Sequence, residues 1–212
     1  MNDGEAAQAV REHLRISAAL QRAVEEQCLD AIVAAARTIA SALRGGGKLL
    51  LCGNGGSAAD CQHMAGELVS RLSADFPRPA LPAVALTTDS SILTAVSNDF
   101  GFEGVFARQV QALGRSGDVL LGISTSGTSP NVLRAIEAAQ RIPMATIALT
   151  GTQGRLRALA DVAITVPSNS VQHMQEAHLS VEHILCYLVE RDLYHGATTT
   201  GSSLAVSEVG RE

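Results

Sequence analysis

Five short apolar runs that alternate with stretches of helical periodicity constrain the fold of this chain more than any other feature. They span residues 49–52, 83–86, 119–123, 145–149 and 162–166. Consecutive apolar residues are typical of strands buried on both faces, and alternation with helices is typical of a parallel sheet. The pattern therefore predicts an α/β fold, in which helices cover both faces of a doubly wound five-stranded parallel sheet.

The segments between and around these runs are predicted to be helical. They lie at about 57–72, 90–97, 105–113, 131–141 and 154–160, with longer helices over 5–44 and 171–194. Glycines 45–47 end the first of them, because glycine adopts the left-handed conformation of a helix end at little cost. We expect a single domain over 1–195, and a disordered Gly/Ser/Thr-rich tail over 196–212.

Composition excludes several classes of partner. The chain has 212 residues, 16 basic and 21 acidic side chains, a net charge of −5, and four Phe, two Tyr and no Trp. Nucleic acid is therefore not expected as a partner. No apolar stretch approaches the ~20 residues needed to span a bilayer, and the acidic start differs from a signal peptide, so no membrane partner is expected. The four cysteines are scattered along the chain, at Cys28, Cys52, Cys61 and Cys186. This distribution is typical of buried free thiols, and we expect a cytoplasmic protein.

The loops after the strands carry the candidate chemistry, because ligands of such sheets bind beyond the carboxyl ends of the strands. After the first strand, residues 53–58 read GNGGSA and open a helix. Glycines there let backbone N–H groups approach an anion. The segment also fits the loose dinucleotide fingerprint G-x-G-x-x-A, but an acidic residue at the required place is missing: Asp75 lies in a loop and Asp89 comes too late. A tight turn without a ligand is the other alternative.

After the third strand, residues 124–129 read STSGTS and open another helix. Five hydroxyl groups at a helix N-terminus are typical of an anion site, where the helix dipole favours negative charge. The loop has no basic residue and no Walker lysine, which favours a single phosphate monoester over a nucleotide. The alternative is that a hydroxyl, that of Ser129, only caps the helix.

Two helices carry candidate metal ligands. His63 and Glu67 are four residues apart, so they share a helix face. The last helix carries Gln175, His178 and His183, and spacing does not decide between the two histidines. Nitrogen and oxygen ligands together favour zinc, although such His/Glu pairs are often ordinary surface residues.

Four motifs in this order resemble the sugar isomerase (SIS) domain family, and more closely its phosphoheptose isomerase branch. They are CGNGGSAADCQHMAGE over 52–67, SND over 97–99, STSGTS over 124–129, and QEAH over 175–178 with His183. The resemblance covers about residues 10–195. It implies an SIS fold, a homotetramer with active sites at subunit interfaces, and one Zn²⁺ per subunit. The implied reaction converts sedoheptulose 7-phosphate to D-glycero-D-manno-heptose 7-phosphate through an enediol, for heptose biosynthesis.

The resemblance also implies roles for individual residues. The matching metal ligands are His63, Glu67, Gln175 and His183, and Glu67 and His183 match the catalytic pair. The residues expected to contact substrate are Asn54, Gly55, Gly56, Ser57, Glu67, Asn98, Asp99, Ser124, Thr125, Ser126, Ser129 and Gln175.

One departure and two alternatives accompany this hypothesis. The family often has Asp-Thr before its Gln-Glu motif, where this chain has Ser170-Val171, so the heptose or its orientation can differ. A non-catalytic SIS protein that binds the bacterial replication initiator is expected to lack the acid and the last histidine, yet Glu67 and His183 are present. An SIS isomerase for another sugar phosphate is expected to lack the His-x-x-x-Glu arrangement with the later Gln/His pair.

Overall fold

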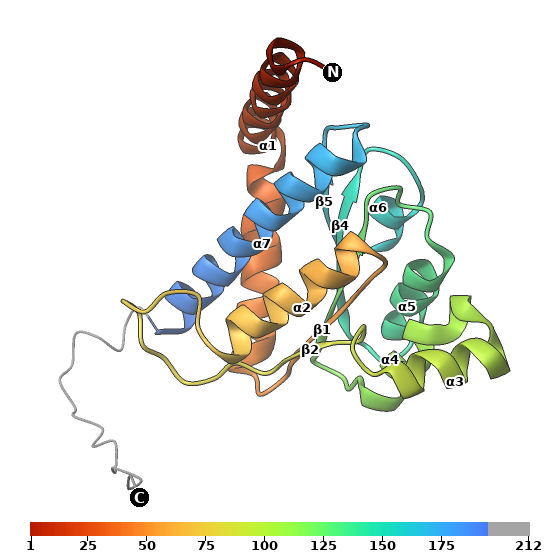
Figure 1. Cartoon of the computed structure of the whole chain (residues 1–212). Coiled ribbons are helices and arrows are strands. Elements are labelled where there is room, and N and C mark those ends of the chain that lie inside the picture. Colours follow the sequence, from red (N-terminus) through yellow and green to blue (C-terminus); the bar gives the residue numbers. More distant parts are fainter. Residues whose placement is uncertain (195–212) are drawn as a thin grey trace, which may run out of the picture.

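The computed structural model describes residues 1–194, which fold around a five-stranded sheet with the order β2-β1-β3-β4-β5 (Figure 1). All neighbouring strands are parallel. The strands are β1 Leu49–Gly53, β2 Ala83–Ala85, β3 Val119–Ser124, β4 Ala145–Gly151 and β5 Val162–Val166. The predicted doubly wound parallel sheet is therefore confirmed.

Every predicted helix is also present, with ends within three residues of the expected ones. The helices are α1 Asp3–Arg44, α2 Gly56–Val69, α3 Ser90–Phe100, α4 Val105–Leu113, α5 Pro130–Gln140, α6 Leu156–Leu159 and α7 Val171–Tyr194. A short 3-10 helix, η1 Phe102–Gly104, was not predicted. The expected tail over 196–212 lies outside the described residues.

Alternate strand residues enter two apolar cores on opposite faces of the sheet. Leu49 and Leu51 of β1 pack with α1, α2 and α7, whereas Leu50 and Cys52 pack with α4 and α5. This division follows from the two-residue period of a strand. The four cysteines, all within the described part, are buried free thiols, as predicted. Within residues 1–194, the helices lack the combination of length and apolar character that a membrane span requires.

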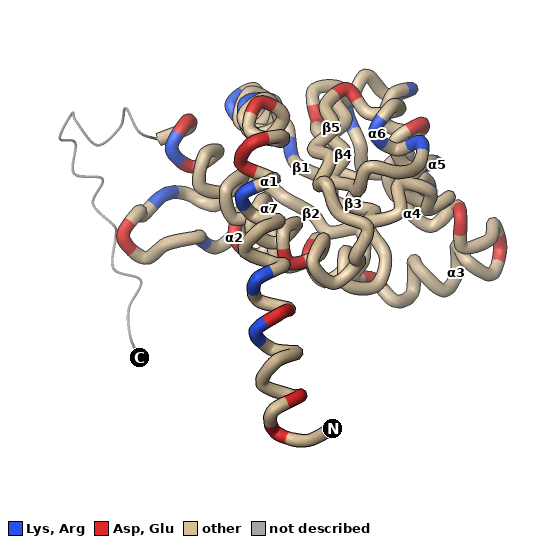
Figure 2. Tube along the Cα trace, turned by 90° about the horizontal axis from the view of Figure 1, so that it is seen from above, with Lys and Arg blue, Asp and Glu red and all other residues tan. Residues whose placement is uncertain are grey.

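The first helix extends beyond the rest of the molecule. Its buried residues begin at Leu20, and the turns before it project away from the sheet (Figures 1 and 2). Acidic and basic residues are interspersed along this projecting part (Figure 2). The helix ends at the predicted glycines, where Gly46 has φ +83°. α1 therefore packs on the sheet only with its second half.

Candidate active site

The strand order places the two glycine- and serine-containing loops side by side. β1 and β3 are parallel neighbours, with Gly53 in register with Ile123. The loops that follow the two strands therefore leave the sheet at the same end. In a sheet of order 2-1-3-4-5 the chain turns to opposite faces after these two strands, which opens a crevice at their carboxyl ends. The site predicted from the loops is thus at the expected place in the fold.

The glycine loop, residues 53–58, is held by a pair of amides. Gly55 has φ +57° at the start of α2, a conformation that favours glycine. Asn54 donates to Asn131 Oδ1 at 2.9 Å, and Asn131 donates back to Asn54 Oδ1 at 2.8 Å. Asn131 was not among the predicted site residues, although it stands only two residues after the serine-containing segment. This amide pair joins the two loops.

The serine loop, residues 124–129, holds its hydroxyl groups close together. Ser124 Oγ lies 2.9 Å from Ser129 Oγ and 3.4 Å from Ser126 Oγ, while Thr125 is half-buried beside them. Gly127 has φ +64°, and a Cβ there would come within 2.3 Å of the Gln153 carbonyl oxygen. The compact turn therefore requires glycine.

The interpretation of Ser129 as the helix cap is wrong. Ser129 occupies the N-cap position of α5, but its hydroxyl is directed to Ser124. The N–H of Val132 donates instead to Asn131 Oδ1 at 3.0 Å, and Pro130 has no N–H to satisfy. The Ser129 hydroxyl is therefore not used by the helix end and stays with the other hydroxyls of the loop. A cavity of about 360 Å³ beside them is lined by Asn54, Phe102, Glu103, Ser129, Pro130 and Asn131.

A second group of predicted residues meets where α2 packs against α7. His63 Nε2 lies 2.8 Å from His183 Nε2 and 3.6 Å from Glu67 Oε1. One ligand atom from each of these three residues lies within 4.8 Å of the others. We call His63, Glu67 and His183 the seam triad. Two imidazole nitrogens and a carboxylate oxygen form a donor set that suits Zn²⁺.

The structure also distinguishes the two histidines that spacing left open. His178 and Glu182 point into the protein and are fully buried, whereas His183 is half-buried at the seam. Burial lowers the pKa of His178 to about 4. Burial, with the Asp60 carboxylate nearby, raises the pKa of Glu182 to about 9. His183, whose Nε2 lies 2.8 Å from His63 Nε2, is therefore the imidazole of α7 that faces α2.

Gln175 lies at the other end of the same seam. Its Nε2 atom is 2.3 Å from the position that a Cβ on Gly56 would take, so only glycine at the first turn of α2 leaves room for it. Because an α-helix rises about 1.5 Å per residue, Gln175 and His183 are about 12 Å apart along α7. Ser57, buried in the same turn of α2, also lies near this end.

The predicted residues thus fall into separate groups within one chain. Glu67 is about 16 Å along α2 from Gly56, so the seam triad lies away from the two loops. Asn98 and Asp99 are exposed on α3, which packs on η1 and α4, and Asn98 donates to Asp99 Oδ1 at 2.8 Å. One chain therefore brings together His63, Glu67 and His183, and separately the glycine and serine loops.

A buried arginine supports the helix end that carries Glu67, and sequence reasoning missed it. Arg78 donates from Nη2 to the Glu67 carbonyl and from Nη1 to the Leu68 carbonyl, both at 2.7 Å. It also forms an ion pair with Glu190 of α7 at 2.7 Å, with side chains 0% and 2% exposed. An arginine within a Pro-rich loop gives no sequence signal for such a contact.

A cavity of about 920 Å³ lies at the opposite end of the sheet. It is lined by residues that precede the strands, including Gly47, Lys48 and Asp118, and Lys48 pairs with Asp118. These residues stand at the amino ends of β1 and β3, away from both predicted groups. We therefore place the candidate active site at the carboxyl ends and the seam.

Comparison with known proteins matches residues 12–151 to the SIS domain family. The chain is 47% identical over 213 residues to the phosphoheptose isomerase of Desulfovibrio desulfuricans, covering 100% of both. It is 50% identical over 190 residues to that of Maridesulfovibrio salexigens, covering 89% of this chain and 92% of the relative. Among solved structures, the phosphoheptose isomerase of Neisseria gonorrhoeae has a TM-score of 0.82 and 43% identity, covering 87% of this chain and 98% of that one. These matches confirm the resemblance.

Proposed function

Because the chain belongs to the phosphoheptose isomerase family of SIS-domain proteins, we propose that it converts sedoheptulose 7-phosphate to D-glycero-D-manno-heptose 7-phosphate. The conversion is a ketose–aldose isomerisation that moves a proton between C1 and C2 through an enediol. It needs a base for the carbon proton, an acid for the oxygen proton and an anchor for the phosphate. The product would enter heptose biosynthesis.

The meeting of Glu67 with His183 is the observation that carries this proposal. Glu67 is the base that removes the carbon proton, and His183 is the acid that moves the oxygen proton. Both side chains project from packed helices and remain partly accessible to solvent, so a substrate can reach them. Each well-placed acid or base contributes about 10²–10⁴-fold to the rate.

The seam triad also fits one Zn²⁺ per subunit. His63, Glu67 and His183 offer nitrogen and oxygen ligands within 4.8 Å of one another, and Gln175 is the fourth ligand that the family resemblance implies. When bound, zinc supplies Lewis acidity that polarises the oxygens on C1 and C2. The chain's own contribution is to hold these ligands on two helices that pack against each other.

The serine loop is the proposed phosphate anchor. Ser124, Ser126 and Ser129 hold their hydroxyls together at the start of α5, where the helix dipole favours an anion. Binding at this remote end orients the sugar for reaction. Asn54, Gly55, Gly56, Ser57, Thr125, Asn98 and Asp99 are the proposed sugar contacts.

We further propose a homotetramer in the cytoplasm, with active sites at subunit interfaces. Within a single chain, Asn98, Asp99 and Gln175 lie apart from the seam triad. A neighbouring subunit would then bring one or more of these residues to it. Val10 and Leu14 support assembly, because these apolar side chains are 59% and 62% exposed on the projecting part of α1. The four buried free thiols are typical of a reducing compartment.

The substitution Glu67→Gln tests the proposed base. It keeps the size of the side chain and removes its basicity, so turnover of sedoheptulose 7-phosphate should fall by about 10²–10⁴-fold or more, with the melting temperature retained. Glu137→Gln is the control, because this partly exposed residue of α5 lies outside the predicted groups, and it should keep full activity. Zinc content measured on the same preparations tests the metal.

Two results would contradict the proposal. Near-normal isomerisation by the Glu67→Gln enzyme would remove Glu67 from the mechanism. Turnover by the unmodified enzyme of a pentose or amino-sugar phosphate, in preference to sedoheptulose 7-phosphate on a substrate panel, would assign a different substrate.

A further inference from the structure

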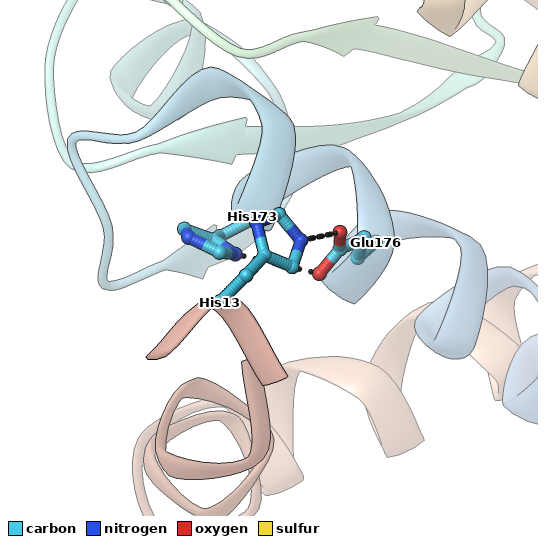
Figure 3. Close-up of side chains that lie close together, drawn as sticks. All are labelled: His13, His173 and Glu176. Carbon is cyan, nitrogen blue, oxygen red and sulfur yellow. Dashed lines mark hydrogen bonds and ion pairs between the residues drawn. The ribbon is translucent and has the colours of Figure 1, made fainter. Parts of the chain in front are cut away.

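A second group of potential metal ligands lies where α1 packs against the first turns of α7, whereas the seam triad lies where α2 packs against a later turn of α7. His13 and Ser17 come from α1, and His173 and Glu176 come from α7; we call these four residues the α1–α7 cluster. Figure 3 shows His13, His173 and Glu176 directed toward one another. Glu176 and His183 are seven residues apart, about 10 Å along α7, and the two groups share no side chain. The cluster is therefore a separate site.

The distances within the cluster suit a metal ion. His13 Nε2 is 2.6 Å from Glu176 Oε1, and His173 Nδ1 is 3.4 Å from Glu176 Oε2. One ligand atom of each of these three residues lies within 4.8 Å of the others. Ligands at about 2.0–2.1 Å from a tetrahedral zinc are about 3.3 Å apart, so small rotations of the side chains would complete the site.

The surroundings supply orientation on one side and access on the other. Ser17 Oγ lies 3.0 Å from His173 Nδ1 and also donates to Glu176. The His173 side chain is only 5% exposed, which restricts its rotation, whereas His13 and Glu176 are 40% and 42% exposed. A neighbouring cavity of about 540 Å³ is lined by both histidines and gives an ion and a water molecule a route to the cluster.

We propose that His13, His173 and Glu176 bind a second divalent metal ion, with Zn²⁺ as the ion that two imidazoles and one carboxylate suit best. Water from the adjoining cavity or the Ser17 hydroxyl fills the fourth position. The ion links the projecting part of α1 to the first turns of α7. This role is structural and requires no substrate.

The test isolates this site from the seam triad. In a His63→Leu background, which removes one seam ligand, equilibrium dialysis against Zn²⁺ should find one ion per chain. Adding His13→Gln should remove that ion, because glutamine keeps a hydrogen bond to Glu176 but is a poor zinc ligand. Adding Glu12→Gln instead is the matched control, since Glu12 lines the same cavity and lies outside the cluster. That variant should keep the ion.

Circular dichroism on each variant checks that α1 remains helical. Two outcomes overturn the proposal: the His63→Leu protein binds no zinc, or His13→Gln leaves its zinc content unchanged. In either case the cluster is a hydrogen-bonded contact between the two helices. Because activity is not the readout, this result is independent of the proposed isomerase reaction.

Discussion

At the scale of single residues, the serine loop shows how a side chain can occupy a cap position without capping. Ser129 stands before α5, yet its hydroxyl faces Ser124, and Asn131 takes over the bond to the helix N–H. An N-cap hydroxyl and a ligand-binding hydroxyl look the same in a sequence. Only the direction of the Oγ atom separates the two roles.

Ser129→Ala should therefore affect binding and leave stability unchanged. We expect the KM for sedoheptulose 7-phosphate to rise by about tenfold, because one hydrogen bond to the phosphate anion is lost. The free energy of unfolding should change by less than about 0.5 kcal/mol. Asp89→Ala is the stability control. Asp89 does cap α3, accepting from the Ile92 N–H at 2.9 Å, and its loss should cost about 1 kcal/mol. Urea unfolding compares them, and a loss at Ser129 as large as at Asp89 would restore the cap interpretation.

At the scale of elements, the contact between α2 and α7 depends on a glycine at one end and a buried arginine at the other. Gly56 leaves space for the Gln175 amide, and Arg78 joins the last turn of α2 to Glu190. Between these two points lie His63, Glu67 and His183. The relative position of the two helices therefore controls the geometry of the seam triad.

Gly56→Ala should displace the Gln175 side chain and reduce activity. The amide is the end of a flexible side chain, so it can move away and the fold should survive. In a Gln175→Ala background the same substitution should add little further loss, because the displaced group is already gone. Steady-state kinetics on the four proteins give the coupling, and fully additive losses would show that Gly56 acts independently of Gln175.

A matched control is available on the same helix. A Cβ on Gly66 would meet no atom of the described residues within 4 Å. Gly66→Ala should therefore raise the unfolding free energy by about 0.5–1 kcal/mol, since alanine is the better helix former.

Arg78→Met should destabilise the protein by about 3–5 kcal/mol, because it leaves the buried Glu190 carboxylate without its partner. Adding Glu190→Leu should recover much of the loss by removing the uncompensated charge. Arg44→Met is the control: its ion pair with Asp192 is exposed, and such pairs contribute about 0–1 kcal/mol. Urea unfolding measures all four proteins, and a loss below 1 kcal/mol at Arg78 would contradict the assigned role.

At the scale of the whole molecule, the projecting part of α1 is the feature that calls for a partner. Apolar side chains stay exposed along it, although one face of the second half of the helix is well buried. A helix that presents an apolar stripe to water is typical of an assembly interface. A second copy of the chain is the partner that the proposed tetramer supplies.

Leu14→Asp together with Val10→Asp should reduce the proposed tetramer to smaller species without unfolding the chain. Both side chains are more than half exposed, so the change removes little packing within one chain. Light scattering measures the mass, and circular dichroism the helix content. Arg15→Ser on the same helix is the control and should leave the mass unchanged; an unchanged mass for the double variant would exclude this surface from assembly.

The sequence by itself determined the architecture. The five apolar runs, the glycine stop after α1 and the helical periods correctly predicted the sheet and its helices, because burial on both faces leaves a continuous apolar pattern. The loops and the candidate ligands were also identifiable, since they follow the strand ends or share a helix face. That much is local information.

Only the tertiary structure decided which side chains meet. The packing of α2 on α7 brought His183 rather than His178 to His63. The packing of α3 on η1 and α4 kept Asn98 and Asp99 apart from that group. The tertiary structure also revealed the contacts of Asn131 and Arg78 and the α1–α7 cluster. Members of that cluster are up to 163 residues apart in the chain. Such contacts depend on helix rotation and on the distance between elements, and residue spacing within one element carries no information about either.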